Sequence, residues 1–174
     1  MLRVFNKLRK IGVITEPLPD TEQRALEEIG ARVKEGIGRR FQGSLAIREV
    51  DAGSCNGCEL EIHALNNAYY NLERFGIHFV ASPRHADLLL VTGPVSRHMQ
   101  TALLRTYEAT PDPKLVIAVG ECGANGGEFG VSYASCGAVS NVIPVDGVIR
   151  GCPPTPIDLL RGILEVINQP DTKP

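Results

Sequence analysis

Four cysteines, spread over three short loops, place the strongest constraint on how this 174-residue chain folds. Cys55 and Cys58 share one loop, whereas Cys122 and Cys152 lie singly in two others. Each loop is rich in glycine or proline and follows an apolar run that is typical of a strand. Loops of this kind bring distant thiolates to one point, where they hold either zinc or an iron–sulfur cluster.

Short apolar runs alternate with helical stretches from residue 46 onward. We predict strands at 46–50, 77–81, 87–92, 115–119 and 142–145, with a further short one at 148–149. Helices are expected at 59–75, 96–108 and 156–168, and the glycine-rich stretch 120–137 is expected to be a long loop. Buried strands that alternate with helices indicate a parallel sheet with both faces covered. Ligands of such sheets gather at the carboxyl ends of the strands, where two of the cysteine loops fall.

The first part of the chain has a different pattern. Residues 22–37 place apolar side chains at spacings of three and four, which predicts an amphipathic helix. We consider two interpretations: a surface helix packed on its own domain, or an arm that docks on a partner or a membrane subunit. The predicted organisation is an N-terminal arm with partner docking over 1–45, followed by one domain over 46–174.

Composition excludes several classes of protein. The net charge of −2 gives no electrostatic case for nucleic-acid binding. No apolar run reaches the roughly 18 residues that a membrane span needs, and no cleavage site follows the basic start, so we expect no secretory signal. Five cysteines are an odd number, which argues against a disulfide framework. The chain is therefore expected to be reduced and cytosolic.

The cysteine spacing alone leaves three interpretations open. The pair Cys55 and Cys58 fits a thioredoxin-like motif or half of a zinc site, but a thioredoxin-like motif leaves the other two cysteines unexplained. Structural zinc sites usually add a second close pair, whereas Cys122 and Cys152 are single and flanked by glycine. Glycine leaves backbone N–H groups free to approach cluster sulfides. The pattern favours an iron–sulfur cluster over zinc, and zinc over dithiol redox chemistry.

Several other residues near the cysteines are candidates for function. Glu59 follows Cys58 directly and is either a proton relay or an acid favoured at a helix start. Glu61 and Glu121 are weaker candidates for the same role. Cys136 is expected to be a small buried hydrophobe. The four histidines share no spacing and are expected to be surface or packing residues.

Three motifs resemble a known family. They are Cys-Asn-Gly-Cys-Glu at 55–59, Gly-Glu-Cys at 120–122 and Gly-Cys-Pro-Pro at 151–154. They resemble the small subunit of membrane-bound (group 4) [NiFe] hydrogenases, which include formate hydrogenlyase. They are also similar to the homologous cluster-bearing 20 kDa subunit of respiratory complex I. The resemblance covers roughly residues 46–167 and is weak in residues 1–45.

The resemblance implies a flavodoxin-like core that holds one [4Fe–4S] cluster through Cys55, Cys58, Cys122 and Cys152. The chain would be a non-catalytic electron-relay subunit of an oxidoreductase complex. It would relay electrons between a ferredoxin-like multi-cluster subunit and the nickel–iron site of a large subunit, for proton reduction or hydrogen oxidation. Integral membrane subunits would complete the complex. The chain itself would be peripheral, held by its partners on the cytoplasmic face of the inner (cell) membrane.

Two alternatives remain beside this reading. One is a complex I-type subunit that passes electrons from its [4Fe–4S] cluster to quinone, and the other is a zinc-stabilised structural module. The complex I subunit typically has adjacent cysteines in its first loop, whereas two residues separate Cys55 from Cys58 here. Classical hydrogenase small subunits carry further cysteine motifs that this chain lacks. A group 4 subunit with a single cluster therefore fits better.

Overall fold

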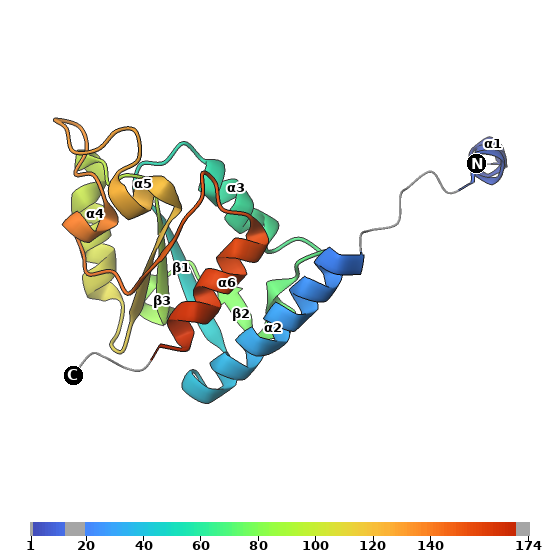
Figure 1. The fold of residues 1–174 in the computed structure, drawn as a ribbon, viewed down its shortest axis with the longest axis horizontal. Coiled ribbons are helices and arrows are strands. Elements are labelled where there is room, and N and C mark those ends of the chain that lie inside the picture. The colour runs from blue at the N-terminus through green and yellow to red at the C-terminus, as the bar shows by residue number, and fades with distance from the viewer. Residues whose placement is uncertain (1, 13–19, 170–174) are drawn as a thin grey trace.

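The computed structural model describes residues 2–12 and 20–169 and contains one parallel sheet between layers of helices (Figure 1). The strands pair in the order β2-β1-β3-β4-β5, which is the strand order of flavodoxin-like folds. Their bounds are β1 (Leu45–Asp51), β2 (Ile77–Phe79), β3 (Leu88–Thr92), β4 (Leu115–Val119) and β5 (Gly147–Ile149). The predicted flavodoxin-like α/β fold is therefore confirmed.

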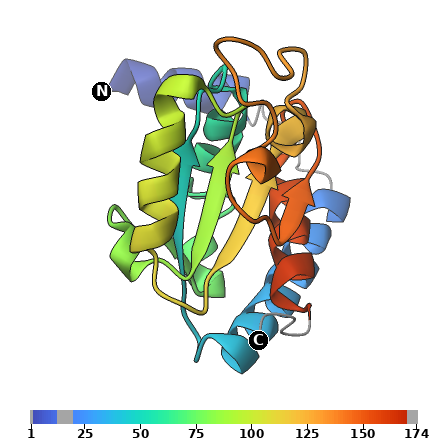
Figure 2. The same cartoon turned by 90° about the vertical axis from the view of Figure 1, so that its left-hand side faces the viewer.

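Helices cover both faces of this sheet (Figure 2). One face carries α2 (Asp20–Arg40), α3 (Gly57–Ala64) and α6 (Pro156–Ile167), and the other carries α4 (Arg97–Ala109). The remaining helical elements are α1 (Leu2–Ile11), α5 (Gly120–Asn125), η1 (Leu72–Phe75), η2 (Pro83–His85) and η3 (Val139–Asn141). Within the two described segments, no helix is both long enough and apolar enough to cross a membrane.

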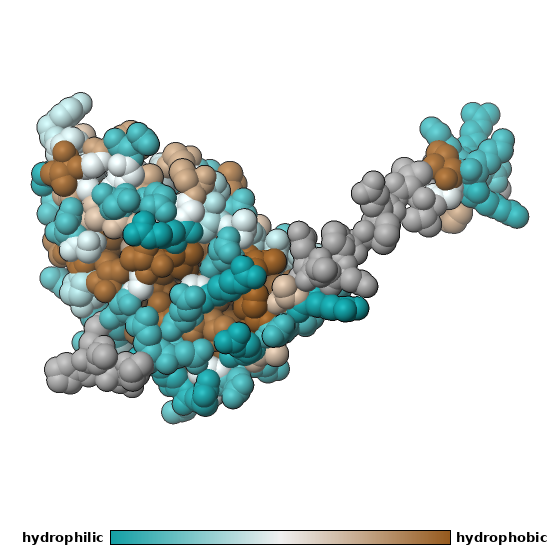
Figure 3. All heavy atoms as spheres, viewed as in Figure 1, coloured by the Kyte–Doolittle hydropathy of each residue, from teal (hydrophilic) through white to brown (hydrophobic). Residues whose placement is uncertain are grey.

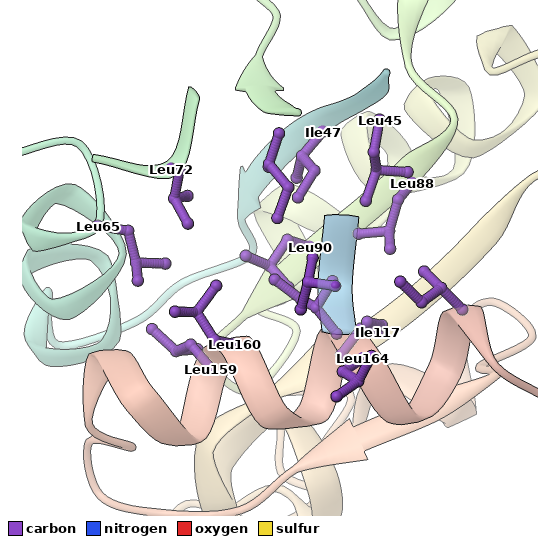
Figure 4. Packing of buried hydrophobic residues seen from close by; sticks show 14 of the residues in the cluster. Leu45, Ile47, Leu65, Leu72, Leu88, Leu90, Ile117, Leu159, Leu160 and Leu164 are labelled. Atoms are coloured by element: carbon purple, nitrogen blue, oxygen red, sulfur yellow. The ribbon is translucent and has the colours of Figure 1, made fainter. Parts of the chain in front are cut away.

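The central strand β3 divides its side chains between two hydrophobic cores. Leu88 and Leu90 lie on the side of the sheet that faces α6 and belong to the same hydrophobic cluster as Leu164 of that helix (Figure 4). Leu89 and Val91 point to the opposite side, into the core beneath α4. Successive side chains of a strand face opposite sides of a sheet, so a strand buried on both faces must be apolar throughout. That requirement explains the uninterrupted apolar run that predicted this strand.

The amphipathic helix predicted at 22–37 is α2, and its apolar stripe packs on its own domain. Leu26 and Ile29 are buried on this stripe, and α2 lies against α6. Gly30 faces the ring of Phe75 so closely that a Cβ at this position would overlap the ring. The first of the two interpretations of this helix is therefore correct. Partner docking by the arm over 1–45 stays a prediction.

The helix predicted at 59–75 was too long, because α3 ends at Ala64. The Oδ1 atom of Asn67 accepts hydrogen bonds from the backbone N–H groups of Tyr69 (2.9 Å) and Tyr70 (3.0 Å). An asparagine that bonds its own following backbone forms a turn that competes with a helix. The chain therefore turns before the short helix η1 begins.

The strand predicted at 142–145 was wrong, whereas the short strand predicted at 148–149 is β5, which completes the sheet. Ile143 is apolar because it packs into the core beneath α4, not because it pairs in the sheet. Pro144 has no N–H to donate to a strand partner. Asp146 forms the first link to the sheet, since its Oδ2 accepts from the N–H of Val116 and its N–H donates to the Val116 carbonyl, both at 2.8 Å.

Two helical glycines provide a test of how tightly the α6 layer packs. A Cβ at Gly162 in α6 would overlap the side chain of Ile149, whereas a Cβ at Gly38 in α2 would meet nothing within 4 Å. We expect Gly162→Ala to lower the free energy of unfolding by about 1–3 kcal/mol through overpacking. Gly38→Ala is the matched control and should raise it by about 0.5–1 kcal/mol. Urea denaturation measures both, and equal effects would contradict the packing described for α6.

Candidate metal centre

The three cysteine loops leave the sheet at one level. Asp51 of β1 pairs with Thr92 of β3, and Thr92 pairs with Val119 of β4. Val119 in turn pairs with Ile149 of β5. Each of these residues is the last of its strand. The carboxyl ends of the four strands therefore form one edge, which is where ligands bind in open parallel sheets.

All four cysteines singled out by the sequence lie at this edge. Cys55 and Cys58 follow β1, and Cys58 stands in the first turn of α3. Cys122 lies on α5, so the stretch 120–137 begins as a helix and not as the predicted loop. Cys152 follows β5. The structure thus brings together residues that are almost one hundred positions apart.

Local hydrogen bonds give the first cysteine loop its shape. The Oδ1 atom of Asp51 accepts from the N–H groups of Gly53 (2.8 Å) and Ser54 (2.9 Å). The Ser54 hydroxyl then accepts from the N–H of Asn56 at 3.0 Å. Asn56 adopts a left-handed conformation with φ of 71°, which asparagine tolerates better than most residues. This chain of turns fixes the backbone on both sides of Cys55.

The first loop touches the second at a glycine. Gly120 has a φ of +77°, and a Cβ built on it would lie 2.7 Å from the Sγ atom of Cys58. Both the backbone angle and the close sulfur require glycine here. The next residue, Glu121, donates its N–H to the carbonyl of Gly151 at 3.0 Å. The second loop is therefore tied to the third, next to Cys152.

Two further glycines complete the contacts around the thiols. A Cβ on Gly127 would lie 2.7 Å from the Sγ atom of Cys122. A Cβ on Gly57 would lie 3.5 Å from the Sγ atom of Cys55 and 3.9 Å from Pro153 of the third loop. The backbone thus approaches the sulfur atoms closely from several sides.

The four cysteines differ from the fifth in exposure. Cys55 and Cys152 are exposed, and Cys58 and Cys122 are half-buried. Cys136 is buried and packs in the core beneath α4, as predicted for a small hydrophobic residue. Only the four cysteines of the edge are open to a ligand or to a partner chain.

Burial, together with nearby negative charge, makes two of the thiols harder to ionise. Burial, and then the negative charges of Glu59 and of the other three thiolates, raise the pKa of Cys58 to about 12. Burial also raises the pKa of Cys122, and the charges of Cys152 and Cys55 add to the effect. A set of thiols with raised pKa values loses its protons when cations neutralise the thiolates, as in metal coordination. The chemistry of these donors therefore fits a cationic group.

A single zinc ion and a four-iron cluster place different demands on four thiolates. Among residues 2–12 and 20–169, no three His, Cys, Asp or Glu side chains converge closely enough to hold one ion. A four-thiolate zinc site needs all its sulfur atoms about 2.3 Å from one ion. In a four-iron cluster each thiolate binds a different iron, so the ligands surround a larger body. Both kinds of site need the four thiols at one edge of the sheet, where the three loops place them.

The acidic residues near the cysteines have different surroundings. Glu59 is buried, and neither of its carboxylate oxygens has a hydrogen-bond partner in the described part of the chain. Glu121 is held by Arg150, whose Nη1 lies 3.0 Å from its Oε2, and by the side-chain amide of Asn125 at 3.3 Å. Glu61 is half-buried. Of the three acids, only Glu59 is buried, and its carboxylate oxygens have no hydrogen-bond partner among the described residues.

Glu49 of β1 was missed by the sequence analysis. Burial raises its pKa, and the charge of Glu59 adds to this effect, whereas the charge of His63 opposes it. Its signal in the sequence was an acidic residue inside a strand, directly after Arg48. His63, His85 and His98 are exposed and His78 is half-buried.

Large apolar side chains are exposed next to the cysteine loops. Leu60, two residues after Cys58, is 61% exposed. Phe129, Val131 and Tyr133 lie in the segment that follows α5, and each is at least 65% exposed. We call these four residues the apolar rim. Leu60 lies on α3, and the other three residues lie in the loop that follows α5 (Figure 1). Exposed apolar side chains beside a site are candidates for contact with a partner chain.

Comparisons with known proteins agree with the predicted resemblance. The chain is 44% identical over 146 residues to formate hydrogenlyase subunit 7 of Escherichia coli (strain K12), covering 84% of this chain and 56% of that protein. It is 43% identical over 150 residues to a probable membrane-bound hydrogenase subunit of Pyrococcus furiosus, covering 86% of this chain and 87% of that one. The chain thus spans little more than half of the first relative.

A solved structure shares the fold. It is that of the membrane-bound sulfane sulfur reductase, an archaeal respiratory membrane complex, and one of its chains matches with a TM-score of 0.66 and 37% identity. The match covers 81% of this chain and 78% of the other. Residues 55–166, which include all three cysteine loops, match the family described as NADH ubiquinone oxidoreductase, 20 kDa subunit. The chain therefore belongs to this family of oxidoreductase-complex subunits.

Proposed function

We propose that this chain binds one [4Fe–4S] cluster through Cys55, Cys58, Cys122 and Cys152 and relays electrons in a membrane-bound [NiFe] hydrogenase complex. The observation that carries the proposal is the meeting of three loops at one sheet edge, where glycines pack against the sulfur atoms of Cys58 and Cys122. The raised pKa values of these thiols add support, since cations would relieve the mutual repulsion of the thiolates.

Bound there, a [4Fe–4S] cluster would supply one-electron transfer at a potential set by nearby hydrogen bonds, charge and solvent exposure. The chain's own residues act on those three properties. Gly120 and Gly127 let the backbone come close to the thiols, where a side chain would push it away. Glu59 brings negative charge, and as a buried acid with unpartnered oxygens beside Cys58 it is our proposed proton relay. The apolar rim would exclude water once a partner covers it.

The proposed partners follow from the exposed side of the site. The large subunit with the nickel–iron site would cover Cys55, Cys152 and the apolar rim, which are open in this chain. A ferredoxin-like multi-cluster subunit would exchange electrons with this chain from another side. Integral membrane subunits would complete the complex at the cytoplasmic face of the inner (cell) membrane. The names of two relatives, formate hydrogenlyase and membrane-bound hydrogenase, support this assignment.

A second candidate is a complex I-type subunit that passes electrons to quinone. The family description, which names NADH ubiquinone oxidoreductase, favours it. The spacing of Cys55 and Cys58 favours the hydrogenase, because the complex I subunit typically has adjacent cysteines. A zinc-stabilised structural module is a weaker third reading, since structural zinc sites usually add a second close pair of cysteines, whereas Cys122 and Cys152 are single.

Elemental analysis of the complex that copurifies anaerobically with the tagged chain tests the proposal. Iron together with nickel, and hydrogen-dependent reduction of a viologen dye, are the expected results. Iron without nickel, together with quinone reductase activity, would transfer the assignment to the complex I type. Zinc without iron would refute the electron-relay function altogether.

We expect serine at any of the four proposed ligands to remove the cluster. In the purified complex, Cys55→Ser, Cys58→Ser, Cys122→Ser and Cys152→Ser should each lose most of the iron and acid-labile sulfide of this subunit, with hydrogen turnover near background. Cys136→Ser is the matched control and should keep both, because its side chain lies in the core beneath α4. Full iron content and activity in any of the four would contradict the ligand assignment.

A pair of glycine variants separates the thiol contact from backbone strain. Gly120 and Gly130 both have positive φ angles, +77° and +49°, but only a Cβ at Gly120 meets a thiol. Gly120→Ala should therefore lower cluster occupancy several-fold, measured as iron and sulfide per complex. Gly130→Ala carries similar strain and should leave occupancy near that of the wild type. Equal losses in both variants would mean that strain, not the Cys58 contact, is responsible.

A further inference from the structure

The ten-residue helix α1 separates positive charge from apolar side chains. It contains Arg3, Lys7, Arg9 and Lys10 and no acidic residue, although the whole chain has a net charge of −2. Arg3, Lys7 and Lys10 recur at spacings of four and three, which places them on one face of a helix. Phe5 falls on the opposite side of the helix, whereas Ile11, four residues after Lys7, borders the basic face and Arg9 lies beside Phe5. α1 is therefore amphipathic and strongly basic.

The described side chains of α1 are exposed. Phe5 is 70% exposed and Ile11 is 50% exposed, so the described part of the chain does not cover them. Figure 3 shows hydrophilic side chains crowded on the outer flank of α1. Helices shorter than about 12 residues are marginal in water, and most draw their stability from what their apolar face contacts. α1 therefore needs a surface outside the described chain.

We propose that α1 lies in the surface of an anionic lipid bilayer and binds this chain directly to the membrane. A basic polar face opposite Phe and aliphatic residues is the pattern of helices that lie in the plane of the membrane interface. Lys and Arg near such a surface are attracted to its negative lipids. A protein groove would need matching acidic residues, whereas a bilayer offers negative charge and an apolar layer together. The inference is independent of the cluster and of the electron acceptor.

The absence of tryptophan from the sequence allows a specific test on the full chain. Phe5→Trp introduces the only indole, and Phe129→Trp is the matched control, because Phe129 is similarly exposed, at 65%, but lies in the apolar rim. With vesicles of phosphatidylcholine and phosphatidylglycerol, the F5W emission should shift to shorter wavelength and be quenched by brominated acyl chains. The F129W emission should stay unchanged. An F5W emission that does not respond to these vesicles would overturn the proposal.

Removal of charge tests the electrostatic half of the proposal. The double variant Lys7→Gln with Lys10→Gln should bind the same vesicles roughly 30-fold more weakly in a cosedimentation assay. Each Lys near an anionic surface contributes about 1 kcal/mol, which is a factor of slightly more than five. Lys34→Gln with Arg105→Gln removes two exposed charges from α2 and α4 and should change binding less than twofold. Binding should also fall at high salt and be weak with phosphatidylcholine alone.

Other outcomes separate a lipid surface from a protein partner. If the K7Q/K10Q variant sediments with vesicles as strongly as the wild type, α1 is not the lipid contact. If the wild-type chain does not bind vesicles, and the K7Q/K10Q variant no longer copurifies with the other subunits, α1 docks on a protein. Either result overturns the proposal, and a thermal melt of each variant confirms that the sheet domain is intact.

Discussion

Parallel pairing of β1, β3, β4 and β5 is the constraint on which the rest of the molecule depends. Because the last residues of these strands pair with one another across the sheet, three separate loops begin at one level. Parallel strands need long connections, and the helices that provide them bury both faces of the sheet. The middle of the sheet is therefore packed on both faces, whereas the loops at the carboxyl ends of the strands are not part of this packing. The four thiols occupy that edge, where the fold leaves room for a ligand.

The same edge concentrates groups that are costly to ionise together. Burial and neighbouring charge raise the pKa values of Cys58 and Cys122, and the buried Glu59 has no hydrogen-bond partner in the part of the chain that the structure describes. Glycines at 120 and 127 bring backbone against the sulfur atoms and leave no space for side chains. The packed core thus holds a site with a need for positive charge, because Glu59 and the other thiolates oppose the ionisation of Cys58. In the proposed function, a cationic cluster and a covering partner satisfy it.

Two surfaces of the chain differ in chemistry, one apolar and one basic, and in our proposals they bind different partners. The apolar rim at the cysteine edge carries Leu60 and Tyr133 in the open, as a surface that meets another protein does. Helix α1 combines apolar residues with four basic ones and suits a charged lipid surface. A subunit with both would be positioned by its partners and by the bilayer.

The sequence alone was sufficient for the fold class and for the sheet's central strands, because a strand buried on both faces must be apolar throughout. It also identified the four cysteines of the edge and the buried character of Cys136. It misjudged 59–75 and 142–145, because the turn at Asn67 and the core packing of Ile143 depend on contacts that periodicity does not reveal. Only the tertiary structure decided that Gly120 lies against Cys58. It alone also showed that Glu59 is buried without a hydrogen-bond partner among the described residues and that Glu49 is half-buried on β1. Local spacing fixes the type of an element, whereas the approach of loops distant in the chain is set by strand register and packing.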